Sequence, residues 1–141
     1  MMGLADIVKQ IESAGDPRAW RFERAAFRGD ARNDSAVRVA RICRCSLDTA
    51  KVILCSSWGA WQLMGFNLYD PAGFNWLKHV FDYLADEAAQ RASFEDFCRR
   101  HDVVLSDDDM NDDAKLLAFA RVYNGPANAD AYVARLKAAM A

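Results

Sequence analysis

The sequence predicts an all-α fold, a compact bundle of about seven to nine short helices. Apolar residues recur at helical spacing along most of the chain, whereas the alternation typical of β-strands is nearly absent. Hydrophobic residues make up 52% of the 141 positions, which is enough for one sizeable core and leaves little room for a second. Only 7 glycines and 3 prolines occur, so collagen-like and low-complexity classes are excluded. We therefore expect residues 1–141 to form a single domain.

Four helical segments are expected in the N-terminal part of the chain. The first carries an apolar stripe over 4–11 and ends at Gly15. The second covers about 18–27, and the third spans about 35–42. Ser46 is a good N-cap for the fourth, because its side chain can accept a hydrogen bond from a free backbone N–H of the first helical turn.

Helical spacing stops over 56–73 and then returns. The interrupted segment is rich in small and aromatic residues, contains glycines and ends after Asp70-Pro71. The elements expected beyond it are helices around 74–84 and 94–98, an acidic loop at 106–113 whose last aspartates cap a helix ending at 124–126, and a final helix over about 130–140.

Charge and hydropathy exclude several classes of partner. The formal net charge is −2, whereas a protein that binds duplex nucleic acid normally carries a basic excess. No apolar run approaches the roughly 18 residues that span a bilayer. The N-terminus also lacks the basic stretch and apolar block of a secretory signal. We therefore expect no nucleic-acid partner, no stable membrane insertion and no signal peptide, and we expect a monomer.

Cysteine and histidine give no pattern typical of a metal site. Without a signal peptide, the cysteines are expected to be reduced thiols, and a disulfide stays open only for a protein outside the cytoplasm. The Cys43–Cys45 pair lacks the two-residue spacer of common zinc sites. The acidic loop at 106–113 lacks the alternating ligands and the glycine of a calcium loop. We therefore expect no metal at the residues considered, which are Cys43, Cys45, Cys55, Cys98, His79 and His101.

Glu12 is the first candidate for a chemical role. It follows the apolar stripe of the first helix, one turn beyond Val8, so its side chain is expected at the edge of the core. An apolar wall and the negative end of a helix dipole both raise the pKa of a carboxyl group. A general acid that works near neutral pH needs this environment. Taken alone, the segment also fits a surface glutamate on a short helix.

Residues 56–67 combine aromatic rings with polar side chains and glycines. Rings alone would fit a core, but Ser57, Gln62 and Asn67 lie between them. Because aromatic faces and amide groups are suited to binding a sugar ring and its N-acetyl group, we expect a cleft here. Trp58, Trp61, Phe66 and Tyr123 are assigned to the cleft, whereas Phe74, Phe81, Phe94, Phe97 and Phe119 follow helical spacing and are assigned to the core.

The order of three motifs resembles the pattern of the lysozyme superfamily, both goose-type lysozymes and soluble lytic transglycosylases. The motifs are Glu12-Ser13 at the end of the first helix, the segment from Ser57 to Asn67, and Tyr123-Asn124-Gly125-Pro126. The chain is more similar still to the peptidoglycan N-acetylmuramidase domain of phage endolysins. Its central segment resembles that family's central motif almost residue for residue, Phe22-Glu23-Arg24 resembles an aromatic-Glu-Arg segment, and 119–126 with Tyr132 and Leu136 resembles the closing motif.

This resemblance implies a lysozyme-like fold around a glycan-binding cleft, without a cofactor. It implies that Glu12 is the catalytic acid and that Glu23 is a second acidic residue near the cleft. The substrate-contacting or cleft-shaping residues that it implies are Ser57, Gln62, Met64, Asn67, Tyr123 and Asn124. The chain departs from the family pattern at Ala14-Gly15, where a Gly-Gly pair is usual, and at Ala60 and Trp61, where Leu and Phe are usual. We also expect no separate cell-wall-binding domain.

The implied activity is hydrolysis of the β-1,4 bond between N-acetylmuramic acid and N-acetylglucosamine in peptidoglycan. Glu23 is the first candidate for a second carboxylate, and Asp70 is a distant second. Two alternatives stay open: a lytic transglycosylase that forms 1,6-anhydro products, and a non-catalytic glycan-binding or interaction module of the same fold. The resemblance also implies a phage or prophage endolysin that is made in the host cytoplasm and acts on the periplasmic cell wall after release, or a lysin carried on the virion.

Overall fold

The computed structural model describes residues 2–29, 33–69 and 79–141. These residues form nine α-helices, two 3-10 helices and one small antiparallel sheet, which confirms the predicted mainly helical, lysozyme-like fold. The helices are α1 (Leu4–Ser13), α2 (Arg24–Gly29), α3 (Asn33–Cys43), α4 (Leu47–Leu54), α5 (Gly65–Tyr69), α6 (Val80–Leu84), α7 (Glu87–Arg100), α8 (Asp113–Asn124) and α9 (Ala129–Met140). The strands are β1 (Trp20–Phe22), β2 (Ser56–Trp58) and β3 (Leu63–Met64), and the 3-10 helices are η1 (Asp108–Asn111) and η2 (Pro126–Asn128).

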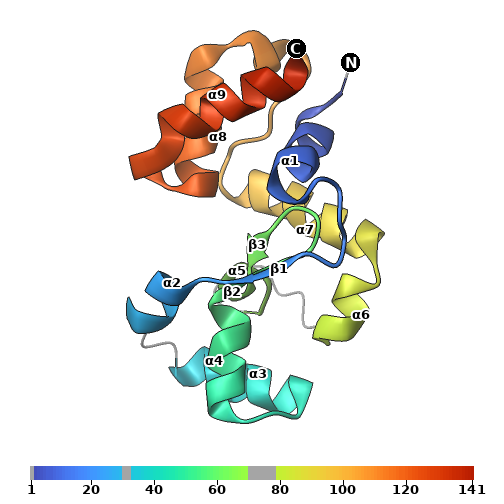
Figure 1. Cartoon of the computed structure of the whole chain (residues 1–141), viewed down its shortest axis with the longest axis vertical. Helices are drawn as coiled ribbons and strands as arrows, with labels where there is room; N and C mark the ends of the chain where they lie inside the picture. Colours follow the sequence, from blue (N-terminus) through green and yellow to red (C-terminus); the bar gives the residue numbers. More distant parts are fainter. Residues whose placement is uncertain (1, 30–32, 70–78) are drawn as a thin grey trace.

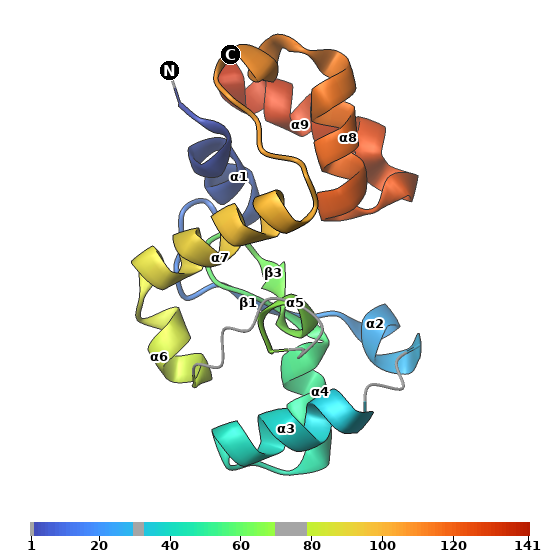
Figure 2. The same cartoon turned by 180° about the vertical axis from the view of Figure 1, so that it is seen from behind.

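The sheet lies between two groups of helices. Figures 1 and 2 show α1, α8 and α9 together at one end of the molecule and α3 with α4 at the other, with the strands between them. In the sheet, Trp20 pairs with Trp58 and Ser57 pairs with Met64, so β2 is the central strand. Because α1 and α9 pack together, residues from both ends of the chain meet on one side of the strands.

The helix α1 buries its apolar stripe, as predicted. Ala14 then adopts a left-handed conformation with φ 54°, and its N–H donates to the Gln10 carbonyl at 3.0 Å. The helix thus ends at Ser13, just before the predicted end at Gly15. Glu12 therefore lies in the last turn of α1, at the end of the helix that faces the strands.

Two predicted helix caps are confirmed. At the start of α4, Ser46 Oγ accepts the Thr49 N–H at 3.1 Å. At the start of α8, Asp112 at the end of the acidic loop accepts the N–H groups of Ala114 and Lys115, at 3.0 Å and 3.2 Å. Both side chains satisfy backbone donors that the first turn of a helix leaves free, and they fix where the two helices begin.

Two segments differ from their predicted structure. Residues 18–27 contain strand β1 followed by the start of α2, rather than a single helix. The segment 56–73 is not wholly irregular, because it contains β2, β3 and the short helix α5 before the described residues end at Tyr69. Strands of two or three residues are too short to show alternation in a sequence, so the sheet could not be predicted from the hydrophobic pattern.

The assignment of phenylalanines to the core is confirmed at three positions and wrong at one. The confirmed residues, each at most 5% exposed, are Phe94, Phe97 and Phe119. Phe81 is 74% exposed. The short helix α6 buries Tyr83, and Phe81 lies two residues away, roughly on the opposite side of the helix. Phe74 lies outside the described residues, as do the other predicted helical residues up to 78.

All four cysteines are free thiols in this structure. Cys55 and Cys98 are buried, and burial raises the pKa of the Cys98 thiol to about 12, so this thiol stays protonated. No helix in the described part of the chain combines the length and the apolar character needed to cross a membrane. Over the same ranges, no three histidine, cysteine or acidic side chains gather in a way that would hold a metal ion.

Candidate active site

One groove brings together residues that are far apart in the sequence. It has a volume of about 380 Å³ and lies where α1, β1, the β2–β3 hairpin and the end of α8 meet. The predicted site residues that line it are Glu12, Glu23, Ser57, Gln62, Met64, Tyr123 and Asn124. The remaining predicted residue, Asn67, lines an adjoining hollow of about 240 Å³ that shares Gln62, Met64 and Tyr123 with the groove. All of the predicted residues therefore lie in two hollows with a common wall.

Hydrogen bonds to α1 and α8 hold the turn between β2 and β3. Ser13 Oγ donates to the Ala60 carbonyl at 2.8 Å. Trp61 Nε1 donates to the Ala5 carbonyl at 2.8 Å, and the Tyr123 hydroxyl donates to the Trp61 carbonyl. The hairpin turn is thus bonded to both ends of α1 and to the C-terminal part of α8. These bonds set the spacing between Glu12 and the hairpin across the groove.

The buried amide of Gln90 on α7 holds the same turn from another direction. Its Oε1 accepts the Ala60 N–H at 2.8 Å, and its Nε2 donates to the carbonyls of Pro17 and Tyr83, at 2.8 Å and 3.0 Å. Gly59 lies against this amide with φ 79°, and a Cβ at that position would come within 2.6 Å of the Gln90 side chain. Glycine is required there for both its left-handed backbone and its small size.

Ser57 and Gln62 form a hydrogen-bonded pair on the wall of the groove. Ser57 Oγ donates to Gln62 Oε1 at 2.7 Å, and Gln62 Nε2 donates to the Gly59 carbonyl at 2.9 Å. These bonds fix the orientation of the amide, while Gln62 itself adopts φ 51°, which is uncommon for a residue other than glycine. Because an amide nitrogen carries two N–H groups, the contact with Gly59 uses only one of them.

Glu12 lies at the edge of the groove in mostly buried surroundings. The hydroxyl of Tyr132, on α9, donates to Glu12 Oε1 at 2.6 Å. Burial raises the pKa of the Glu12 carboxyl, and the charge of Glu23 adds a smaller rise. The hydrogen bond from Tyr132 and the positive charges of Arg135 and Arg21 lower this pKa, but burial outweighs them. The direction of the shift agrees with the raised pKa predicted for Glu12.

Glu23 lies in the same groove but in a different electrostatic setting. Arg21 Nε lies 2.7 Å from Glu23 Oε1, and the Glu23 side chain is 31% exposed. Its backbone N–H donates to the Cys55 carbonyl at 2.9 Å, which fixes the residue between β1 and α2. The groove therefore holds one buried carboxyl with a raised pKa and one carboxylate in an ion pair. Asp70, the other candidate for a second carboxylate, lies outside the described residues.

The prediction that Trp58 and Trp61 line the cleft is wrong. Trp58 is 8% exposed and Trp61 is 1% exposed, and Trp58 Nε1 donates to the Ile53 carbonyl at 2.8 Å. The hairpin turns both rings into the core and presents polar groups to the groove. The other two aromatic residues assigned to the cleft, Phe66 and Tyr123, do line it.

Three residues around the groove were not predicted from the sequence, namely Arg21, Gln90 and Tyr132. Tyr132 is four residues from Leu136, and both are fully buried, so their spacing indicates only the core face of a helix. The Tyr132 hydroxyl nevertheless reaches Glu12, which is 120 positions away in the sequence. The only signal for this contact in the sequence is that Tyr132 belongs to the segment that resembles the closing motif of a known family.

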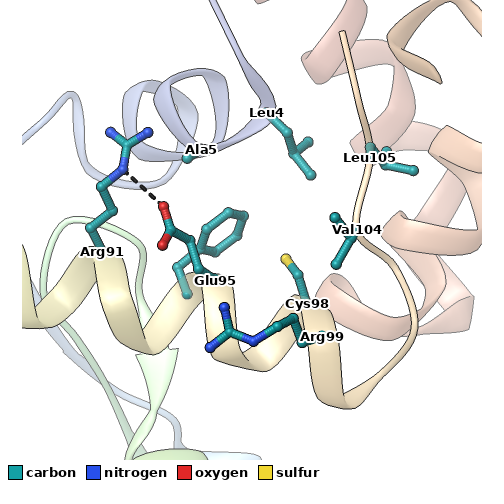
Figure 3. Close-up of a pocket in the computed structure, with 9 residues that line it drawn as sticks. Leu4, Ala5, Arg91, Glu95, Cys98, Arg99, Val104 and Leu105 are labelled. Carbon is teal, nitrogen blue, oxygen red and sulfur yellow. Dashed lines mark hydrogen bonds and ion pairs between the residues drawn. The ribbon is translucent and has the colours of Figure 1, made fainter. Parts of the chain in front are cut away.

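Apart from the groove and the hollow that adjoins it, a second hollow, of about 390 Å³, lies between α1, α7 and the segment that follows α7 (Figure 3). Its lining is largely apolar. Arg91 pairs with Glu95 at 3.1 Å, and Arg99, which also lines it, pairs with Asp96 at 3.1 Å. Its acidic side chain is thus ion-paired, and the hollow contains none of the predicted site residues. The groove at Glu12 is the better candidate for acid catalysis.

The chain is similar to known proteins over most of its length. The sequence model of the N-acetylmuramidase family matches residues 8–141, a range that includes every groove residue named above. An endolysin of Enterobacteria phage PRD1 is 39% identical over 129 residues, which cover 86% of this chain and 85% of the relative. No solved structure matches the chain.

Proposed function

This chain belongs to the N-acetylmuramidase family, and from this we propose that it is a peptidoglycan hydrolase whose catalytic groove is the one at Glu12. The bond that it cleaves, in this proposal, is the β-1,4 bond between N-acetylmuramic acid and N-acetylglucosamine. One observation supports the proposal most directly. Glu12 is a mostly buried carboxyl with a raised pKa at the edge of a groove lined by both polar and apolar side chains.

Glu12 acts as the general acid. A carboxyl with a raised pKa keeps its proton to a higher pH than an exposed glutamate and is therefore available as a proton donor. Glu12 gives this proton to the glycosidic oxygen as the C–O bond breaks and the sugar acquires oxocarbenium character. Water then adds to the anomeric carbon and releases a proton, so that the net change is the addition of one water across the bond.

Glu23 is the candidate for the second carboxylate of this mechanism. It lines the same groove, and its negative charge would orient water or stabilise the positive charge that develops on the sugar. Its ion pair with Arg21 holds the side chain in one place. The same ion pair also offsets its charge, which reduces the stabilisation that it can supply.

The partial neutralisation of the Glu23 charge by Arg21 favours a second candidate function, a lytic transglycosylase. If Glu12 is the only groove carboxyl that takes part, the 6-hydroxyl of the muramyl sugar attacks the anomeric carbon in place of water. The product then carries a 1,6-anhydro ring and contains one water fewer than the hydrolysis product. The groove residues required for proton transfer are the same in both reactions.

The other groove residues are proposed to bind the glycan. Ser57 and Gln62 present an oriented hydroxyl and amide, which suit the hydroxyl and N-acetyl groups of the sugars. Tyr123 and Asn124 close the α8 side of the groove, and Met64 lies on the hairpin side. Because Asn67 lines the adjoining hollow, it is proposed to contact a neighbouring sugar of the same strand.

The setting of the activity is proposed from the relative. That protein is an endolysin of a phage that infects enterobacteria. We propose that this chain is likewise made in the host cytoplasm and reaches the periplasmic cell wall after release, or is carried on a virion. In this proposal it acts as a monomeric single domain without a metal or other cofactor.

Product analysis tests the proposed reaction. Purified peptidoglycan is digested with the protein, the new reducing ends are reduced with borohydride, and the fragments are identified by mass spectrometry. We expect reduced N-acetylmuramic acid at the new ends. Reduced N-acetylglucosamine would contradict the proposed bond, anhydro ends would identify the transglycosylase, and intact glycan strands would leave only a binding module.

A further inference from the structure

The two oxygens of the Glu12 carboxyl are in different surroundings. Oε1 accepts a hydrogen bond from the Tyr132 hydroxyl at 2.6 Å. Within the described part of the chain, no hydrogen bond to Oε2 is found. Since Glu12 lines the groove, we infer that Oε2, the oxygen not bound by Tyr132, is the one that meets a substrate. Oε1 therefore binds Tyr132, and Oε2 is the oxygen that can transfer a proton to a substrate.

Tyr132 is held in place by packing on all sides. Its side chain is fully buried, and its ring lies against those of Phe119 and Tyr123, with centroids at 6.4 Å and 6.1 Å. The guanidinium of Arg135 lies over the same ring, 5.6 Å from its centroid. A ring confined in this way delivers its hydroxyl to one position only.

A second bond ties the same two helices together. Arg135 Nη2 donates to the Ile11 carbonyl at 2.6 Å, one residue before Glu12. Arg135 and Tyr132 both lie on α9, so α9 contacts the last turn of α1 at a backbone carbonyl and at the Glu12 side chain. The C-terminal helix thus fixes both the helix end and the carboxyl group that it carries.

We propose that Tyr132 is a positioning residue for Glu12, which fixes Oε2 as the oxygen that carries the acidic proton and stabilises the carboxylate left after the proton is transferred. A hydroxyl that donates to Oε1 leaves no favourable place for a proton on that oxygen, so the carboxyl proton resides on Oε2. After transfer, the same hydrogen bond becomes charge-assisted and stronger. This inference rests on the proposed role of Glu12 as general acid.

Several groups around Glu12 shift the pKa of its carboxyl, and Tyr132 is one of them. Burial raises the pKa of Glu12, and the hydrogen bond from Tyr132 is the largest of the effects that lower it. Arg135 on α9 and Arg21 on β1 also lower it, and Glu23 raises it. Burial and the Glu12 charge raise the pKa of Tyr132 itself, so this hydroxyl stays a neutral donor throughout the working range.

The test is the pH dependence of kcat in the variant Tyr132→Phe, which keeps the ring and removes the hydroxyl. Because the hydrogen bond stabilises the carboxylate, its removal raises the pKa of Glu12, and the alkaline limb of the profile moves upward by about one pH unit. We also expect kcat on the acidic plateau to fall by about tenfold, with little change in KM. An alkaline limb at the wild-type pH in a folded variant would overturn the inference.

Tyr83→Phe is the matched control. Tyr83 is also buried and its hydroxyl bonds Ser93, but it lies on α6 and does not line the groove. This variant is expected to lose a buried hydroxyl without a shift of the alkaline limb. An equal shift in both variants would mean that loss of any buried hydroxyl moves the profile, and it would overturn the role of Tyr132.

A measurement on the wild-type protein covers the case in which Tyr132→Phe does not fold. The hydroxyl proton of Tyr132 is expected to move downfield in NMR spectra as Glu12 ionises, because the hydrogen bond becomes charge-assisted. A resonance that is unchanged across the titration of Glu12 would overturn the inference. The variant Glu12→Gln separates the two proposals: if it stays active, the general acid is wrong, whereas an inactive Glu12→Gln with an unshifted Tyr132→Phe rejects the positioning role alone.

Discussion

Replacing Glu12 with glutamine is expected to lower kcat/KM for peptidoglycan by about 10²–10⁴-fold. An amide of the same shape cannot donate a proton to the glycosidic oxygen, but its carbonyl oxygen can still accept the hydrogen bond from Tyr132. The fold is therefore expected to persist, with a thermal midpoint close to that of the wild type. The rate is measured as the release of soluble muropeptides from purified peptidoglycan.

Glu95→Gln is the control for this variant. Glu95 lines the second hollow, on α7, where it pairs with Arg91 on the protein surface. An exposed ion pair contributes little to stability, so this change is expected to leave both rate and stability unchanged. Loss of activity in Glu95→Gln together with normal activity in Glu12→Gln would place the catalytic site in the second hollow instead.

Replacing Gly65 with alanine is expected to lower the free energy of unfolding by about 3 kcal/mol or more. A Cβ at this position would lie 1.9 Å from the Ile53 carbonyl oxygen and 2.9 Å from Leu54 Cα. These are backbone atoms of α4, so no side chain can rotate away to make room. The start of α5 and the end of α4 would have to separate. Chemical denaturation of the variant measures the loss.

Gly3→Ala is the matched control for Gly65→Ala. A Cβ at Gly3 would meet only Asp107 Oδ1, at an ordinary contact distance of 3.8 Å. Gly3 is the N-cap of α1, where alanine is a poorer cap than glycine, so we expect the free energy of unfolding to fall by no more than about 1 kcal/mol. A Gly65→Ala protein as stable as Gly3→Ala would show that α4 and α5 are not packed as closely as described here.

The predictable part of the site depends on local structure. The position of Glu12 at the edge of the core could be predicted, because an apolar stripe fixes which face of α1 is buried and Glu12 lies one turn beyond that stripe. The predicted residues of the hairpin came from the motif that they share with a known family. The assignment of Trp58 and Trp61 to the cleft is wrong, because the sequence of a short hairpin does not show which side chains face the core until the pairing of its strands is known.

The unpredictable part depends on contacts between distant segments. The bond between Tyr132 and Glu12 joins the two ends of the chain, and the amide of Gln90 joins α7 to a turn 30 positions before it. Nothing in the spacing of either residue distinguishes it from a core residue. The three strands were missed because strands this short show no alternation, and because β1 pairs with a strand far along the chain.

In the proposed mechanism, the proton carried by Glu12 is the one used in catalysis. The most direct test of this role is an NMR titration of the Glu12 carboxyl carbon, identified by its absence from the Glu12→Gln spectrum, beside the pH dependence of kcat/KM in the wild type. We expect a pKa raised above the ordinary value of a glutamate, in line with the burial of this group, and an alkaline limb at the same pH. A Glu12 pKa that is not raised, or a limb that falls at a different pH, would contradict the proposed role of Glu12.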